Sequence, residues 1–295
     1  MILNYPKVAI LATFFGLWID SYLSHQMQMW FGFALIFTFG ILHGANDLAI
    51  IENINLENKA LKFSKVLLYY VIMVLIGAGL FYAKPLLALG LFVLVSGYHF
   101  GEQHWIKKIT VKNNFVVSTF QLLYGLLILF LIFTFHAVEV QHIVYEITSK
   151  KVPFAFFMVG LKVISVALLL LGFWLFFRSK DFKNCVVKEL FYLLVFIIIF
   201  KVSNLIWGFA LYFILWHSIP SMQDQIQFLY GELNFKNLKK YFVSAFPYWI
   251  ISILGICILY LLFKDQKIFN AVFFSFLASI TFPHVIVIVK MLEKK

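Results

Sequence analysis

The sequence predicts an all-α fold, a polytopic transmembrane helix bundle of about 8–10 membrane segments. Three observations lead to this prediction. First, 63% of the 295 residues are hydrophobic and 13% are charged, whereas soluble domains carry about 25% charged residues. Second, the chain contains a series of apolar runs, most of them close in length to the roughly 20 residues that cross a bilayer. Third, most basic residues lie in the short polar stretches between these runs.

Eight apolar runs are interpreted as spans, and one further region is ambiguous. The runs lie near 8–23, 30–50, 66–83, 85–100, 115–136, 154–177, 241–263 and 268–290. The region from Glu189 to His217 fits either one long tilted helix or two short helices that turn at residues 201–204. Residues 218–240 are expected to form a polar loop, either without regular structure or with one short surface helix. We therefore expect a single integral-membrane domain over residues 1–295.

The distribution of lysine and arginine favours two helices in the ambiguous region. With a cytoplasmic N-terminus, two helices place most of the basic loop residues on the cytoplasmic side, whereas one helix divides them more evenly. Positively charged loops favour the cytoplasm. The predicted protein is therefore a multi-pass protein of the cell (inner) membrane with ten segments. Orientation in the lipid bilayer accounts for the net charge of +11, and no nucleic-acid partner is predicted.

Four histidines fall in different segments of this topology, at similar depth in the cytoplasmic half. Ionisable side chains inside a membrane are costly and usually functional. Neutral imidazole is a common ligand of iron, copper and zinc, and the absence of a carboxylate-rich cage argues against magnesium or calcium. A lone membrane histidine can equally be a packing residue, but four at one depth favour a shared site. The predicted metal ligands are His43, His99, His217 and His284.

Two acidic residues stand one helical turn from predicted ligands. Asp47 follows His43 at i+4, and Glu102 follows His99 at i+3. Such neighbours can accept the second ring N–H of a metal-bound histidine and fix its orientation. The alternative is that both acids simply lie at the water interface. We interpret Asp47 and Glu102 as outer partners of the metal ligands.

Four segments carry a resemblance to a known family. They are HGANDL at 43–48, SGYHFGEQHW at 96–105, WHSIPS at 216–221 and PH at 283–284. Together they resemble the Brp/Blh family, the bacterial and archaeal membrane β-carotene 15,15′-dioxygenases that produce retinal. The resemblance extends from the second span to the last. It implies Fe(2+) held by histidines, with His43, His99 and His217 at ligand positions.

The resemblance also implies a reaction and its partners. The expected reaction is cleavage of the central double bond of β-carotene, or of a related apolar carotenoid, by dioxygen. Its product is retinal, which admits a retinal-binding rhodopsin as a downstream partner. No catalytic residue beyond the metal ligands is predicted.

One position departs from the family pattern. Family members carry a second histidine four residues after the one at 217, and this chain has Ser221 there. The fourth ligand is then His284 or, alternatively, His104; otherwise the site has three protein ligands.

Three other functions are alternatives to this one. A di-iron membrane desaturase needs H-x-x-x-H or H-x-x-H-H boxes, which the sequence lacks. A metal-ion or proton transporter can use intramembrane histidine and aspartate, but it would more often show two related halves, and no internal repeat is evident. A divergent carotenoid-cleaving or carotenoid-binding membrane protein stays open because of Ser221.

Overall fold

The computed structural model describes residues 5–58, 63–262 and 266–294. The structure is 88% helical, and its described residues contain no strand. Seven of the described helices are long and apolar enough to cross a membrane. The predicted fold class, a polytopic helical membrane protein, is confirmed. The seven are Ser64–Ala83, Pro85–Trp105, Asn114–Phe135, Phe154–Arg178, Leu205–Tyr230, Phe235–Leu262 and Ser275–Glu293.

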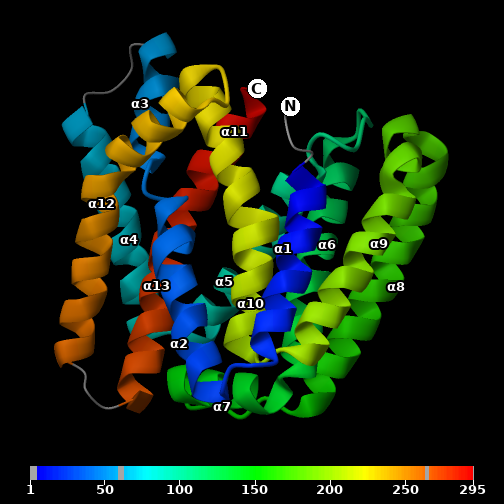
Figure 1. Ribbon diagram of the computed structural model, residues 1–295, viewed down its shortest axis with the longest axis horizontal. Helices are drawn as coiled ribbons and strands as arrows, with labels where there is room; N and C mark the ends of the chain where they lie inside the picture. Colours follow the sequence, from blue (N-terminus) through cyan, green and yellow to red (C-terminus); the bar gives the residue numbers. More distant parts are fainter. Residues whose placement is uncertain (1–4, 59–62, 263–265, 295) are drawn as a thin grey trace. The chain divides into compact units, whose positions relative to one another are not determined.

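The chain divides into two compact units, the first made of Met1–Ile36, Ser96–Gln141 and Val152–Ser218. Within it α6, α8 and α9 pack against one another, and α10 packs on α2 (Figure 1). The unit also holds the C-terminal part of α5 (Pro85–Trp105) and the first residues of α7 (Ala137–Thr148). Its remaining helices are α1 (Tyr5–Asp20), α2 (His25–Leu35), α6 (Asn114–Phe135), α8 (Phe154–Arg178), α9 (Lys180–Val202), α10 (Leu205–Tyr212) and the π-helix η2 (Phe213–Ser218).

The ambiguous region of the sequence forms two helices. α9 ends at Val202, and Asn204 caps α10 by accepting a hydrogen bond from Trp207 N at 2.9 Å. The Asn204 amide also donates to Gln28 Oε1 at 2.5 Å. An asparagine cap of this kind satisfies a helix-terminal N–H and favours a new helix start. The predicted turn at 201–204 is thereby confirmed.

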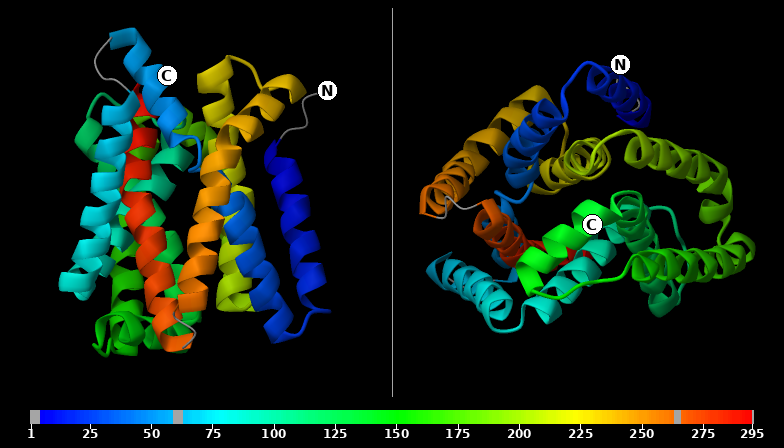
Figure 2. Two further views of the ribbon diagram at one scale, coloured as in Figure 1. Left: turned by 90° about the vertical axis from the view of Figure 1, so that its left-hand side faces the viewer. Right: turned by 90° about the horizontal axis from the view of Figure 1, so that it is seen from below.

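The second unit is made of Phe37–Val95, His142–Lys151 and Ile219–Lys295. In this unit α13 lies between α4 and α12 (Figure 2). The π-helix η1 (Ile36–Gly40) stands at its start. Its other helices are α3 (Asp47–Asn58), α4 (Phe63–Ala83), α11 (Ile219–Tyr230), α12 (Phe235–Leu262) and α13 (Gln266–Glu293).

The expected single helix over residues 30–50 is wrong. The chain leaves the helical path in a turn at residues 43–46, and α3 begins at Asp47. The Asn46 amide donates to the main-chain carbonyl of Tyr241 at 3.0 Å, which holds this turn against α12. An acidic residue in the first turn of a helix is favoured by the helix dipole. The apolar residues on both sides of the turn hide the interruption from a hydropathy analysis.

The expected polar loop at 218–240 is also largely helical. α11 extends to Tyr230, and the chain turns at Gly231, where φ is +81°. Pro220 lies just after η2, inside the continuous helical segment Leu205–Tyr230, so its missing N–H removes a main-chain donor there. Two polar residues four apart, Ser221 and Gln225, face the protein interior. Their polarity therefore marks a buried helix face rather than a solvated loop.

Candidate metal centre

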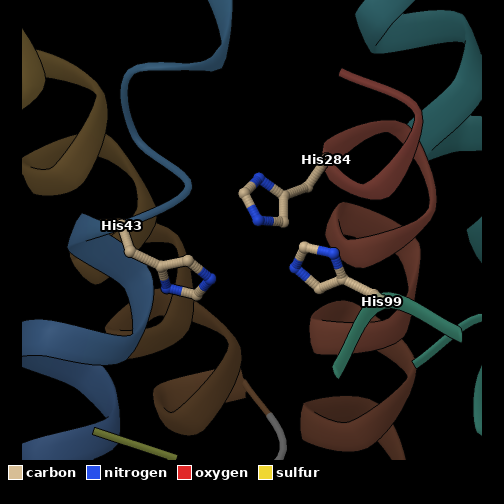
Figure 3. Close-up of side chains that lie close together, drawn as sticks. All are labelled: His43, His99 and His284. Atoms are coloured by element: carbon tan, nitrogen blue, oxygen red, sulfur yellow. The ribbon is translucent and has the colours of Figure 1, made fainter. Parts of the chain in front are cut away.

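His43 and His284 form a buried pair in the second unit. His43 follows η1, and His284 projects from α13. Their ring centroids are 4.8 Å apart, and the ring planes are perpendicular. Figure 3 shows the two rings facing one another; the third side chain drawn there, His99, comes from α5. Only 6% of His43 and 4% of His284 is exposed. Two histidines far apart in sequence are thus adjacent inside this unit.

Both rings of this pair bond an acceptor through Nδ1. His43 Nδ1 donates to the main-chain carbonyl of Gly40, and His284 Nδ1 donates to Asp47 Oδ1 at 2.8 Å. A carbonyl or carboxylate oxygen can only accept a hydrogen bond, so the proton of each neutral ring belongs on Nδ1. The lone pair then lies on Nε2, which is the nitrogen that would coordinate a metal. This is the usual arrangement around metal-bound histidine.

Asp47 joins two helices to the turn that carries His43. Its Oδ2 atom accepts a hydrogen bond from Tyr70 Oη on α4 at 2.9 Å, while Oδ1 accepts from His284 on α13. The sequence spacing led us to expect Asp47 beside His43, on one helical face. Because the chain turns between these two residues, Asp47 instead meets a histidine of another helix. Its carboxylate orients His284.

His99 and His217 form a second buried pair, in the first unit. His99 lies on α5 and His217 in η2, with ring centroids 4.7 Å apart and an interplanar angle of 81°. The His217 ring also contacts Phe100, at 4.6 Å between centroids, and stacks on Phe213 at 5.4 Å. Both histidines are buried. Aromatic neighbours of this kind make the surroundings of the second pair apolar.

Glu102 is buried on α5, one turn after His99. Tyr98 Oη donates a hydrogen bond to Glu102 Oε1 at 3.2 Å. The carboxylate is therefore inside the protein rather than at a water interface, which was the alternative interpretation. Its expected role as an outer partner of His99 stays a prediction.

His104, the alternative ligand, belongs to a different cluster in the first unit. Its Nε2 atom lies 2.5 Å from Glu189 Oε2, and Lys108 Nζ lies 2.9 Å from Glu189 Oε1. Tyr124 Oη is 3.3 Å from the same His104 nitrogen. Burial lowers the pKa of the Lys108 ammonium, and the Glu189 carboxylate opposes that shift. These contacts give His104 a structural role, in linking α5 to α9.

We expect His104→Leu to lower the free energy of unfolding by about 2 kcal/mol, because the buried Glu189 carboxylate loses its hydrogen bond to His104 and keeps only the contact with Lys108. Thermal unfolding of the detergent-purified protein measures this loss, and bound metal is expected to stay unchanged. His142→Leu is the matched control. His142 contacts Glu146 at 3.4 Å with 64% of its side chain exposed, so about 0.5 kcal/mol is expected. Loss of metal without loss of stability in His104→Leu would identify His104 as a ligand.

Ser221 is buried in the second unit, in a network that sequence analysis missed. Gln225 Nε2 donates to Ser221 Oγ at 3.2 Å and to the main-chain carbonyl of His43 at 2.7 Å. Tyr241 Oη donates to Gln225 Oε1 at 2.8 Å. The spacing of Ser221 and Gln225, four residues apart in a membrane-protein helix, was the available signal. Gln103, which donates to the His217 carbonyl at 3.1 Å, was missed as well, although it lies inside one of the four family-like segments.

Comparison with known proteins identifies the family of this chain. The family model described as Beta-carotene 15,15′-dioxygenase matches residues 34–292. The matched region begins in α2, ends in α13 and contains all four paired histidines. Searches of curated proteins and of solved structures give no match. A family match over most of the chain confirms the resemblance seen in the four short segments, and the chain therefore belongs to the β-carotene 15,15′-dioxygenase family.

Proposed function

We propose that this protein cleaves the central double bond of β-carotene with dioxygen and releases retinal. We propose further that one Fe(2+) ion, held by His43, His99, His217 and His284, is its cofactor. Family membership supports a dioxygenase-type function directed at a carotenoid. The observation that carries the metal proposal is the pairing of His43 with His284, whose Nδ1 atoms are both engaged by oxygen acceptors.

The donor atoms present fit an iron ion. Neutral imidazole nitrogen suits iron, copper and zinc, and the family implies iron among these. Rings that share one ion lie close together, as the rings of each pair do. Two imidazoles alone leave most of an iron coordination sphere unfilled. We therefore propose that the two pairs bind the same ion, with His284 taking the place of the family histidine that is Ser221 here.

The proposed reaction balances without further reactants. The carbon–carbon double bond and the oxygen–oxygen bond both break, and each half of the polyene gains one oxygen atom as an aldehyde. No external reductant or proton donor is consumed, which agrees with the absence of a predicted acid–base catalyst. Iron(II), when bound, supplies the activation of dioxygen that this chemistry requires.

The protein's own residues orient the ligands and keep water away. The Gly40 carbonyl and the Asp47 carboxylate hold the Nδ1 protons of His43 and His284, so that both Nε2 lone pairs have fixed directions. Phe100 and Phe213 cover the ring of His217. An apolar, dry site suits a substrate dissolved in the bilayer and limits side reactions with water.

Retinal formation in cells that accumulate β-carotene tests the proposal. We expect retinal from the wild type and from the control His142→Ala, and none from His43→Ala or His99→Ala. Purified wild type is expected to hold one iron per chain. Unconsumed β-carotene, with well-expressed and iron-replete protein, would refute the assignment. An aldehyde other than retinal would instead identify a divergent carotenoid-cleaving enzyme, the alternative that Ser221 leaves open.

The orientation in the membrane is part of the proposal. Two helices in the region 189–217 support a cytoplasmic N-terminus, because this topology places most basic loop residues in the cytoplasm. Labelling of single cysteines placed in the loops near residues 110 and 150 tests it. Only the second position is expected to react with an impermeant reagent added to intact cells.

A further inference from the structure

We infer that Gln103 and Gln225 are positioning residues that fix the main chain of two metal-binding histidines. The inference rests on the proposed function, because it assigns a task to residues that surround the same metal site. Each glutamine uses its side-chain amide as a donor to the carbonyl of a histidine, His217 or His43. The two bonds occur in different units and on different helices, so they are independent observations.

Gln225 is held rigidly in the second unit. It is completely buried, and its Nε2 atom lies 2.7 Å from the carbonyl oxygen of His43. Its Oε1 atom accepts a hydrogen bond from Tyr241 Oη, which is also completely buried. A buried amide whose oxygen and nitrogen are both engaged has one orientation only. The carbonyl of His43 therefore meets a donor of fixed position.

Gln103 makes the corresponding bond in the first unit. It stands four residues after His99 on α5, so both residues lie on one face of that helix. Its Nε2 atom lies 3.1 Å from the carbonyl oxygen of His217. The helix that carries His99 is thereby tied to the main chain of His217. The bond sets the position of the two rings of this pair relative to each other.

These bonds occur where regular helix geometry fails. His217 lies inside the π-helix η2, and His43 lies in the turn that follows η1. A main-chain carbonyl at a helix end has no intrahelical amide donor, and a π-helix pairs its carbonyls with amides five residues on, so the regular pairing changes where it meets an α-helix. Side chains supply such donors throughout these segments. Tyr5 Oη donates to Leu215 O at 2.5 Å, five residues before Pro220, which has no N–H, and Trp249 Nε1 donates to Phe37 O at 3.1 Å.

A fixed carbonyl direction matters for a metal ligand. The orientation of a peptide plane determines the direction of the Cα–Cβ bond beside it, and hence where an imidazole nitrogen lies. Irregular main chain without such a tether would let the ring shift. Loss of an outer partner of a metal ligand typically lowers metal affinity by about 10- to 100-fold. We expect a loss of this size when either glutamine loses its donor.

The test is titration of the detergent-purified, metal-free protein with Co²⁺, followed by visible absorption. Gln103→Met and Gln225→Met keep the side-chain length and remove the donor. Gln225→Glu keeps an oxygen that can accept from Tyr241 and replaces the amide donor with a carboxylate oxygen. The matched control is Gln141→Met, because Gln141 Nε2 also donates to a main-chain carbonyl, that of Val152, at 2.7 Å. Thermal unfolding of each metal-free variant reports the general cost of losing such a bond.

We expect Co²⁺ affinity to fall about 10-fold or more in the three site variants, with a changed absorption spectrum in the fraction that still binds. The control Gln141→Met is expected to match the wild type in Co²⁺ affinity and in absorption spectrum. Its loss of thermal stability is expected to be similar to that of the site variants. The inference about the two glutamines would be overturned if the site variants bind Co²⁺ like the control, or lose binding only in proportion to unfolded protein. The proposed metal site would not be affected by that result. Wild type that binds no Co²⁺ would overturn the proposed metal site together with it.

Discussion

Replacement of His284 by alanine is expected to lower metal affinity by more than about 100-fold. This is more than the loss caused by removing a residue that only hydrogen-bonds a metal ligand. Carotenoid cleavage is expected to disappear with the metal. The reason is that His284 is buried, faces His43 at 4.8 Å between ring centroids, and has its Nδ1 proton engaged by Asp47. We therefore take His284 Nε2 as the metal ligand that replaces the family histidine at position 221, which is serine in this chain. Iron content per chain and retinal yield are the measurements.

The companion variant Asp47→Asn separates a ligand from the residue that orients it. Asparagine keeps the size of the side chain and can still accept from His284 Nδ1, but it carries no charge. We expect a smaller loss of metal affinity, about 10-fold, together with retained cleavage at high iron concentration. Normal iron binding and cleavage in His284→Ala would contradict the prediction. It would leave three histidines, or three and His104, as the protein ligands.

The sequence was sufficient to predict the fold class and one difficult division of helices. Apolar runs identify membrane helices because a bilayer leaves no other means of satisfying the backbone than helices or closed barrels. The division at Ser203–Asn204 followed from the side of the membrane on which lysines lie, not from helix propensity. Both predictions rest on properties that accumulate over many residues, and the structure confirms them.

The partners of individual polar residues could not be predicted in the same way. Asp47 was expected to be the hydrogen-bond partner of His43 because the two are four residues apart. The turn at 43–46 instead places Asp47 beside His284, which is far away in sequence. Gln225 was assigned to a loop because hydropathy cannot distinguish a solvated polar residue from a buried one with hydrogen-bond partners. Such contacts depend on which helices are adjacent, and one sequence contains no direct measure of that.

Gly101→Ala and Gly125→Ala are expected to have the largest effect on stability. α5 and α6 approach so closely that a Cβ atom on Gly101 would lie 1.7 Å from the carbonyl oxygen of Gln121. A Cβ atom on Gly125 would lie 1.8 Å from the carbonyl oxygen of Gly97. Small residues spaced by four allow this approach of helices in membranes. Main-chain atoms cannot turn aside as a flexible side chain can, so the helices must separate.

Each of these substitutions is expected to cost at least about 3 kcal/mol, the upper part of the usual range for overpacking. His99 is two residues from Gly101, so metal affinity is expected to fall with stability. Gly90→Ala, also on α5, is the matched control, because nothing lies within 4 Å of its added Cβ. That control is expected to be neutral or slightly stabilising, since alanine favours a helix over glycine by about 0.5–1 kcal/mol. Thermal unfolding in detergent distinguishes the variants, and equal melting temperatures for Gly101→Ala and Gly90→Ala would show that α5 and α6 are not in such close contact.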